Sequence, residues 1–226
     1  MRKYQAIIFD FDGTLIDSAP GIVLSLAELL KAMGREPLPE EQLRACVGPP
    51  IVQFFPEYLG FHGEELDRAM ITYREIFNKT ALGMLCSFPG VVELLRDIQL
   101  AGMRTGVATC KAQHSCETQA ETLGLRPYLN NIKGVDTSIN LLEKTDILRA
   151  LLEEMDIDPK DAIMVGDRMY DLIAAKAVGM PSIGVLYGGC STVEELEAHD
   201  PLYIVDSVEQ LREVLLSEQT LAQSAV

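Results

Sequence analysis

Two aspartates separated by one residue follow directly on an apolar run near the N-terminus. Residues 6–9 are typical of a buried strand, and the sequence Asp-Phe-Asp-Gly-Thr-Leu occupies residues 10–15. In an extended chain, side chains two residues apart point the same way, so we expect Asp10 and Asp12 to lie side by side. Carboxylates this close repel unless a positive group compensates them, and hard oxygen ligands suit Mg²⁺. Because Gly13 also permits a sharp turn, the pattern predicts a metal-dependent site with one carboxylate free to act as a nucleophile.

Two other structures can begin with the same residues. A calcium-binding loop counted from Asp10 requires glycine at its sixth position and glutamate at its twelfth. The chain has Leu15 and Gly21 there, which excludes this loop. An Asp-x-Asp-Gly sequence is also common turn chemistry after a strand, and this interpretation stays open for the hexapeptide alone.

The elements that must position these residues alternate between strands and helices along most of the chain. A helical pattern covers residues 18–33, and helical pieces cover residues 39–79, broken at 48–50 and 60–63. Further helices are predicted at 89–100, 112–123, 144–155, 169–178, 192–198 and 207–216, and strands at 104–108, 131–135, 162–165, 182–185 and 202–205. A frayed tail is predicted from residue 217.

This alternation predicts an α/β fold, a doubly wound parallel sheet forming a Rossmann-like core. The core is expected to comprise residues 1–16 and 83–226. Residues 17–82 carry only helical patterns, so we expect them to form an inserted all-helical cap domain.

Further polar residues are expected at the edge of the sheet where Asp10 lies. In open parallel sheets, ligands bind beyond the carboxyl ends of the strands. Thr109 follows one predicted strand, Asp167 follows another with Asp171 four residues later, and Lys144 begins the intervening helix. The sequence therefore predicts that a hydroxyl, a lysine and additional carboxylates join the first pair.

This combination resembles the haloacid dehalogenase-like hydrolase superfamily over nearly the whole chain. Four signatures stand in the family's order: Asp-x-Asp-Gly-Thr at 10–14, Thr109, Lys144 and Gly-Asp-x-x-x-Asp at 166–171. The helical segment is similar to that family's helical cap. Residues 47–50 and 184–189 resemble the phosphoglycolate-phosphatase-like branch. Cys110 stands where Ser or Asn is commoner, and residues 189–190 replace a more usual Tyr-Gly pair, which leaves the exact substrate open.

The resemblance implies a role for each acidic residue. Asp10 would attack phosphorus and form an aspartyl-phosphate, and Asp12 would protonate the leaving alcohol and then activate water. Mg²⁺ would be held by Asp10, the backbone carbonyl of Asp12, and Asp167. Asp171 would reach the metal only through water or through another ligand. As alternatives, Asp167 could be a turn residue, and Asp171 could pair with a surface base such as Arg168 or Lys176.

The resemblance also implies a phosphate site. Thr109 would bind a phosphate oxygen with the backbone N–H groups of Phe11, Asp12 and Cys110, and Lys144 would bridge the Asp10 carboxylate and the phosphate. Alternatively, Thr109 could cap the following helix and Lys144 could be a solvated surface lysine. The neighbouring Lys111 is expected to be a solvated residue at a helix start rather than a phosphate ligand.

Composition excludes several classes of protein. The 226-residue chain is 48% hydrophobic, which is ample for a packed interior, and no stretch approaches the roughly 20 apolar residues of a membrane span. A formal net charge of −15 argues against binding to nucleic acid polymers or anionic membranes. The five cysteines are scattered without a Cys-x-x-Cys pair, so neither a zinc site nor a disulfide framework is indicated. With no signal-peptide pattern at the N-terminus, a cytoplasmic protein is expected.

These observations lead to one expected function. We expect a Mg²⁺-dependent phosphatase acting on a small phosphorylated metabolite, as a monomer or homodimer, with the cap choosing the substrate. By resemblance the substrate is phosphoglycolate, followed by a nucleoside 5′-monophosphate or a sugar phosphate. A phosphomutase or a non-enzymatic regulatory protein on the same fold are the alternatives.

Overall fold

A six-stranded parallel sheet forms the centre of the larger body of the molecule. The computed structural model describes residues 4–49 and 51–223. The strands lie in the order β5-β4-β1-β6-β7-β8. Their bounds are β1 (Ala6–Phe9), β4 (Arg104–Ala112), β5 (Asn131–Val135), β6 (Ala162–Gly166), β7 (Ser182–Val185) and β8 (Tyr203–Val205). The predicted α/β fold with a doubly wound parallel sheet is confirmed.

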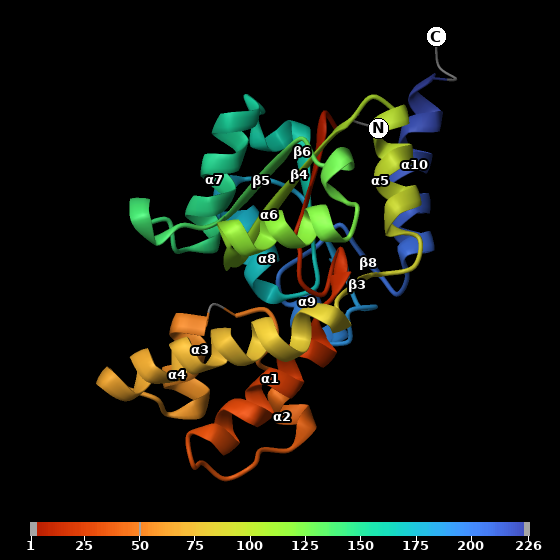
Figure 1. Ribbon diagram of the computed structural model, residues 1–226. Helices are drawn as coiled ribbons and strands as arrows, with labels where there is room; N and C mark the ends of the chain where they lie inside the picture. Colours follow the sequence, from red (N-terminus) through yellow and green to blue (C-terminus); the bar gives the residue numbers. More distant parts are fainter. Residues whose placement is uncertain (1–3, 50, 224–226) are drawn as a thin grey trace.

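Helices cover both faces of this sheet (Figure 1). Because side chains alternate along a strand, Ile7 and Phe9 of β1 pack on one face, whereas Ala6 and Ile8 pack on the other. The first face is covered by α5 (Val91–Leu100), α6 (Gln113–Thr122) and α10 (Val208–Gln223). The second is covered by α7 (Lys144–Met155) and α8 (Met169–Val178). Such two-sided burial explains why the strands are continuous apolar runs.

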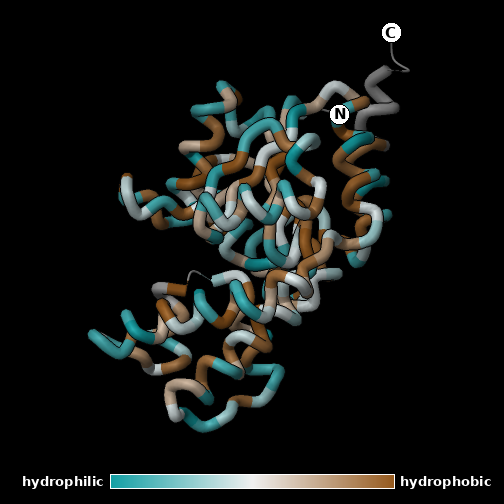
Figure 2. The backbone as a smooth tube through the Cα atoms, in the orientation of Figure 1, coloured by the Kyte–Doolittle hydropathy of each residue, from teal (hydrophilic) through white to brown (hydrophobic). Residues whose placement is uncertain are grey.

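A smaller helical body lies beside the carboxyl edge of the sheet, at the bottom of Figure 1. It contains α1 (Ala19–Ala32), α2 (Glu40–Arg44), α3 (Ile51–Leu59), α4 (Gly63–Ile76), the π-helical η1 (Phe77–Ala81) and the 3₁₀ turn η2 (Leu82–Met84). These helices bury a hydrophobic core of their own, which includes Leu29, Phe55 and Phe61. Figure 2 shows hydrophobic residues recurring along them between hydrophilic ones. We call this body the cap.

Two short antiparallel strands join the cap to the sheet. β2 (Ile16–Asp17) pairs with β3 (Cys86–Ser87), so the chain leaves and re-enters the larger body at one place. This pair was absent from the sequence prediction, because two-residue strands carry no periodic pattern. The remaining short elements are α9 (Val193–Glu197) and the 3₁₀ turns η3 (Arg126–Tyr128), η4 (Thr137–Ile139) and η5 (Pro159–Asp161).

Two elements extend well beyond their predicted ends. Helix α10 continues to Gln223, although a frayed tail was predicted from residue 217. Strand β4 continues to Ala112 instead of ending at residue 108, with a register irregularity before Ala112 pairs with Val135. Gly134 permits this extension, because a Cβ there would lie 2.5 Å from the Lys111 carbonyl oxygen. None of the helices in the described ranges combines the length and the hydropathy needed to cross a bilayer.

Candidate active site

Buried polar side chains gather at the carboxyl edge of the sheet, next to the cap. Asp10 follows β1, which lies between β4 and β6. Thr109 lies in the last part of β4, Asp167 follows β6, and Lys144 is the first residue of α7. Each of these side chains is less than a tenth exposed. The structure therefore brings the sequence-predicted residues of four separate segments to one place.

Three of the carboxylates form a cluster suited to a divalent cation. Asp10, Asp167 and Asp171 each place an oxygen within 4.8 Å of the others. The pKa of Asp10 is raised to about 6, because burial and the nearby Asp171 charge together outweigh the lowering effect of Lys144. Burial, with the charges of Asp10 and Asp171, also raises the pKa of Asp167 well above its usual value. Within the described residues, Asp167 Oδ2 is buried without a hydrogen-bond partner. Such uncompensated hard oxygen donors fit Mg²⁺.

Two glycines allow the carboxylates to approach so closely. Gly13 has φ +77°, and a Cβ there would lie 2.2 Å from Asp167 Oδ2. A Cβ on Gly166 would lie 2.3 Å from Asp171 Oδ2. Any larger residue at either position would displace a carboxylate of the cluster, so both motif glycines have a direct steric role.

Lys144 supplies the positive charge inside the cluster. Its Nζ donates a hydrogen bond to Asp10 Oδ1 at 2.8 Å and forms an ion pair with Asp171 Oδ1 at 2.7 Å. Burial alone would lower the lysine pKa, but the adjacent carboxylates of Asp10 and Asp171 raise it above its usual value. Lys144 is therefore a charged, buried residue, and its interpretation as a solvated surface lysine is wrong.

Asp171 lies inside the site rather than on the surface. It is 1% exposed, and its Oδ2 accepts the backbone N–H of Arg168 at 3.1 Å. Lys176, a possible surface partner, instead pairs with Asp200 at 2.8 Å. The alternative in which Asp171 pairs with a surface base is therefore wrong. Asp171 instead belongs to the same carboxylate cluster as Asp10 and Asp167.

Thr109, Cys110 and Lys111, near the end of β4, lie on the β4 side of the site. Thr109 Oγ1 accepts the Lys111 N–H at 3.2 Å, and α6 begins only at Gln113 with Ala112 at its N-cap, so Thr109 is no helix cap. Burial raises the pKa of the Cys110 thiol to about 12, which keeps it protonated and unreactive near neutral pH.

The backbone N–H groups of Phe11 and Asp12 are available to a ligand. They donate none of the hydrogen bonds found between described residues, although the Phe11 carbonyl accepts from Leu15 and Ile16 at 3.0 Å. Free N–H groups beside a buried hydroxyl and a lysine are suited to bind a phosphate.

The structure adds one residue that the sequence did not predict. Lys111 was expected to be solvated at a helix start, but it lies in the extension of β4 and its side chain is only 10% exposed. Its Nζ donates to both carboxylate oxygens of Asp12, each at 2.8 Å. The available signal was its position two residues after Thr109, which places both side chains on one face if the strand continues.

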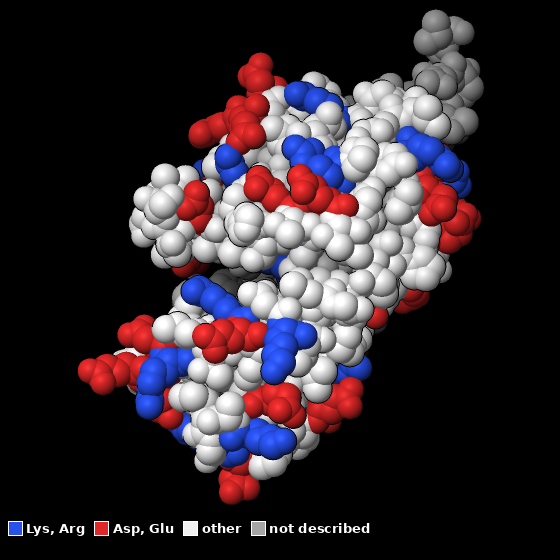
Figure 3. Space-filling model, viewed as in Figure 1, with Lys and Arg blue, Asp and Glu red and all other residues white. Residues whose placement is uncertain are grey.

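The cap closes the site from the opposite side. Phe77 of η1 lies over Lys111, with Nζ 5.6 Å from the ring centroid. Burial raises the pKa of Tyr73 in α4, and the Asp12 charge raises it further. Figure 3 shows the surface hollowed between the two bodies, with Lys and Arg side chains bordering the hollow.

Arg168 links the two bodies at a second place. Its guanidinium donates to the backbone carbonyl of Val47 in the cap, and its Nε donates to Glu195 at 3.0 Å. Gly48, with φ +108°, has no Cβ to obstruct this contact, since one would lie 2.7 Å from Arg168 Cγ. Asp167 therefore belongs to the carboxylate cluster, whereas the next residue, Arg168, binds the cap.

Known proteins share this sequence and fold. A family model described as haloacid dehalogenase-like hydrolase matches residues 7–185. A 5′-nucleotidase from Pseudomonas aeruginosa is 33% identical over 215 residues, covering 95% of this chain and 97% of that protein. A phosphoglycolate phosphatase from Vibrio vulnificus is 29% identical over 223 residues, covering 95% and 97%.

A crystal structure of a predicted phosphatase from Clostridium acetobutylicum aligns with a TM-score of 0.89 and 35% identity. The alignment covers 95% of this chain and 99% of that one. The family match spans most of the chain and includes all of the buried polar residues described above. The chain therefore belongs to the haloacid dehalogenase-like hydrolase family, among its phosphatases.

Proposed function

We propose that this phosphatase hydrolyses a small phosphomonoester with Mg²⁺ through an aspartyl-phosphate on Asp10. The observation that carries the proposal is the placement of Asp10, the central carboxylate of the edge, in contact with Lys144 and beside two further buried carboxylates. Lys144 occupies Asp10 Oδ1, which leaves the second oxygen of Asp10 free of this hydrogen bond to attack phosphorus.

Charge neutralisation explains the composition of the site. Phosphoryl transfer needs the attacking and leaving oxygens in line and the charge on the transferring group compensated. Asp10, Asp167 and Asp171 would hold Mg²⁺ directly or through water, with the Asp12 carbonyl as a further ligand. The cation would polarise the phosphate and reduce its repulsion by Asp10.

The remaining residues divide the work of binding and proton transfer. Thr109, Lys144 and the N–H groups of Phe11, Asp12 and Cys110 would hold the phosphate oxygens. As the Asp10 oxygen bonds to phosphorus, the bond to the leaving oxygen breaks and that oxygen takes a proton from Asp12. Asp12 then accepts a proton from the water that attacks the aspartyl-phosphate, which releases inorganic phosphate and restores Asp10.

The substrate is proposed from similarity rather than from site geometry. Relatives that align over nearly the whole chain include a 5′-nucleotidase and a phosphoglycolate phosphatase. We propose phosphoglycolate or a nucleoside 5′-monophosphate as the substrate class, with sugar phosphates next. We further propose that the reaction takes place in the cytoplasm, where the five unpaired cysteines would stay reduced.

Phosphate release from a panel of these esters tests the proposal. Wild-type protein is assayed with Mg²⁺ and with a chelator, beside Asp10→Asn and the surface variant Asp97→Asn. We expect wild type to release phosphate with Mg²⁺ and to lose this activity in the chelator. Asp10→Asn should be inactive, and Asp97→Asn should be as active as wild type. Full activity of Asp10→Asn would contradict the assignment of the nucleophile. A bisphosphate intermediate without net release of phosphate would identify a phosphomutase instead.

A further inference from the structure

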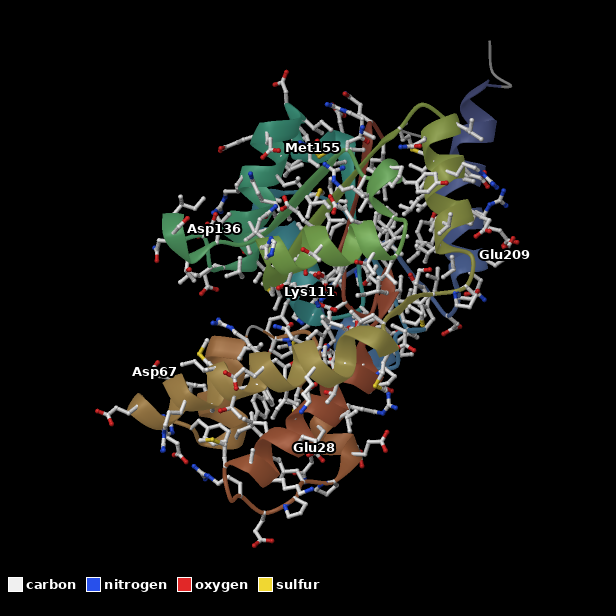
Figure 4. The ribbon with its side chains drawn as sticks, in the orientation of Figure 1. Glu28, Asp67, Lys111, Asp136, Met155 and Glu209 are labelled. Carbon is white, nitrogen blue, oxygen red and sulfur yellow. The ribbon has the colours of Figure 1, made fainter. Side chains whose placement is uncertain are left out.

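Lys111 lies between the proposed proton donor and the cap. Figure 4 shows it at the junction of the two bodies, below the sheet and above the cap helices. Its Nζ is 2.8 Å from both oxygens of Asp12, and it lies 5.9 Å from the Phe11 ring centroid and 5.6 Å from that of Phe77. The ammonium group is therefore held between two rings and one carboxylate, with its side chain only 10% exposed.

The backbone of Lys111 is fixed as firmly as its side chain. Its N–H donates to Thr109 Oγ1, and its carbonyl oxygen packs where a side chain on Gly134 would lie. Lys111 thus connects the residue proposed to bind phosphate with the residue proposed to move protons, through one short segment of β4.

Asp12 depends on this contact for its orientation. Among the described residues, Lys111 is the group whose hydrogen bonds fix the Asp12 carboxylate, and that carboxylate is 14% exposed. Lys144 is occupied by Asp10 and Asp171 and does not serve Asp12. Each aspartate of the first motif thus has its own lysine: Lys144 binds Asp10, and Lys111 binds Asp12.

We propose that Lys111 is a positioning residue, which holds the carboxyl group of Asp12 so that, in its protonated form, it faces the oxygen of the leaving alcohol and becomes the carboxylate when it gives up its proton. The proposal rests on the proposed function, because it requires Asp12 to protonate that oxygen as its bond to phosphorus breaks. Loss of Lys111 would leave nucleophilic attack by Asp10 intact and make proton transfer from Asp12 less probable in each encounter.

The consequence is a loss of activity that depends on the leaving group. An alkoxide is a poor leaving group and needs the proton, whereas 4-nitrophenolate leaves without one. The ratio kcat/KM reports the steps up to and including the first irreversible cleavage, so it isolates protonation of the leaving group from hydrolysis of the aspartyl-phosphate.

The experiment compares kcat/KM for 4-nitrophenyl phosphate with that for phosphoglycolate or adenosine 5′-monophosphate, whichever wild type hydrolyses better. Because general acid catalysis contributes about 10²–10⁴-fold, Lys111→Met should lower kcat/KM for the alkyl ester about 100-fold. For 4-nitrophenyl phosphate we expect less than about a threefold loss, because the leaving group needs no general acid. Lys111→Arg should restore most of the difference, since it keeps two donors for a carboxylate. Lys133→Met, which removes a lysine paired with Glu154 away from the site, is the matched control.

Several outcomes would overturn the proposal. Equal losses for both esters would make Lys111 a phosphate ligand. A rise in KM for phosphoglycolate alone, with kcat unchanged, would make it an anchor for the substrate carboxylate. If Lys111→Met does not fold, Lys111→Gln replaces it. The same two esters are then compared for Lys111→Gln and Lys111→Arg, and a larger loss of kcat/KM for the alkyl ester in Lys111→Gln is the expected result. Absence of phosphate release from wild type would instead contradict the proposed function.

Discussion

Replacing the proposed nucleophile should change how the stability of the protein depends on pH in the absence of metal. Asp10 is 5% exposed, and its pKa is raised from 3.8 to about 6, chiefly because burial disfavours its charged form. Between these two values the folded state binds more protons than the unfolded state. The free energy of unfolding of wild type therefore falls as the pH rises through this window.

The structure sets the size of this effect. A pKa raised from 3.8 to about 6 corresponds to a loss on the order of 3 kcal/mol of folding free energy once the pH exceeds the upper value. Asparagine has the same shape and does not titrate. The stability of Asp10→Asn relative to wild type should therefore increase by about 2 kcal/mol between pH 4 and pH 7, which is most of the full effect. The attraction of Lys144 for the charged carboxylate is already part of this pKa, so the test is the slope with pH and not the absolute stability.

Urea unfolding at several pH values, in the presence of a chelator, measures the difference. Asp97→Asn is a control of opposite sign, because hydrogen bonds and charge from Arg212 lower the pKa of Asp97. That variant should lose stability relative to wild type as the pH rises. Addition of Mg²⁺ at pH 7 should stabilise wild type more than Asp10→Asn. A pH-independent difference for Asp10→Asn, or one of the same sign as Asp97→Asn, would refute the reasoning.

Three further substitutions probe the same site and its link to the cap. Lys144→Met removes the cation between two buried carboxylates and should cost about 3–5 kcal/mol in urea unfolding, with part of the loss recovered at acid pH. Gly13→Ala places a Cβ 2.2 Å from Asp167 Oδ2. By displacing that carboxylate it should weaken Mg²⁺ binding about 10–100-fold in calorimetry, and unchanged affinity would remove Asp167 from the ligand set. Arg168→Met removes charged hydrogen bonds to Glu195 and to the cap, so it should cost about 1.5–3 kcal/mol. Faster limited proteolysis within the cap should accompany that loss.

Much of the fold was predictable because local pattern and tertiary burial agree. The strands at residues 6–9 and 182–185 and the helices at 144–155 and 169–178 have the predicted bounds. Each strand is a short apolar run buried on both faces, which leaves a clear signal in the sequence. The positions of Asp10, Asp167 and Lys144 at one edge follow from the parallel order of these strands.

The remaining features depend on contacts that no local pattern encodes. Lys111 reaches Asp12 because an irregular β4 continues past Ala108 and packs against Gly134, a glycine distant in sequence. Lysine side chains are mostly exposed to solvent. The residue type therefore favoured a solvated Lys111, which is wrong. The same reasoning applies to Arg168, whose bond to the Val47 carbonyl depends on how the cap packs against the core.

The central claim is that Asp10 carries the phosphoryl group, and the most direct test is to observe that group on the protein. Wild type and Asp10→Asn are mixed with substrate and Mg²⁺, quenched in acid during turnover, and analysed by peptide mass spectrometry. The account predicts one added phosphoryl group on the peptide that contains Asp10 in wild type, and none in Asp10→Asn. Phosphate release by wild type without this adduct, or the adduct on another residue, would contradict it.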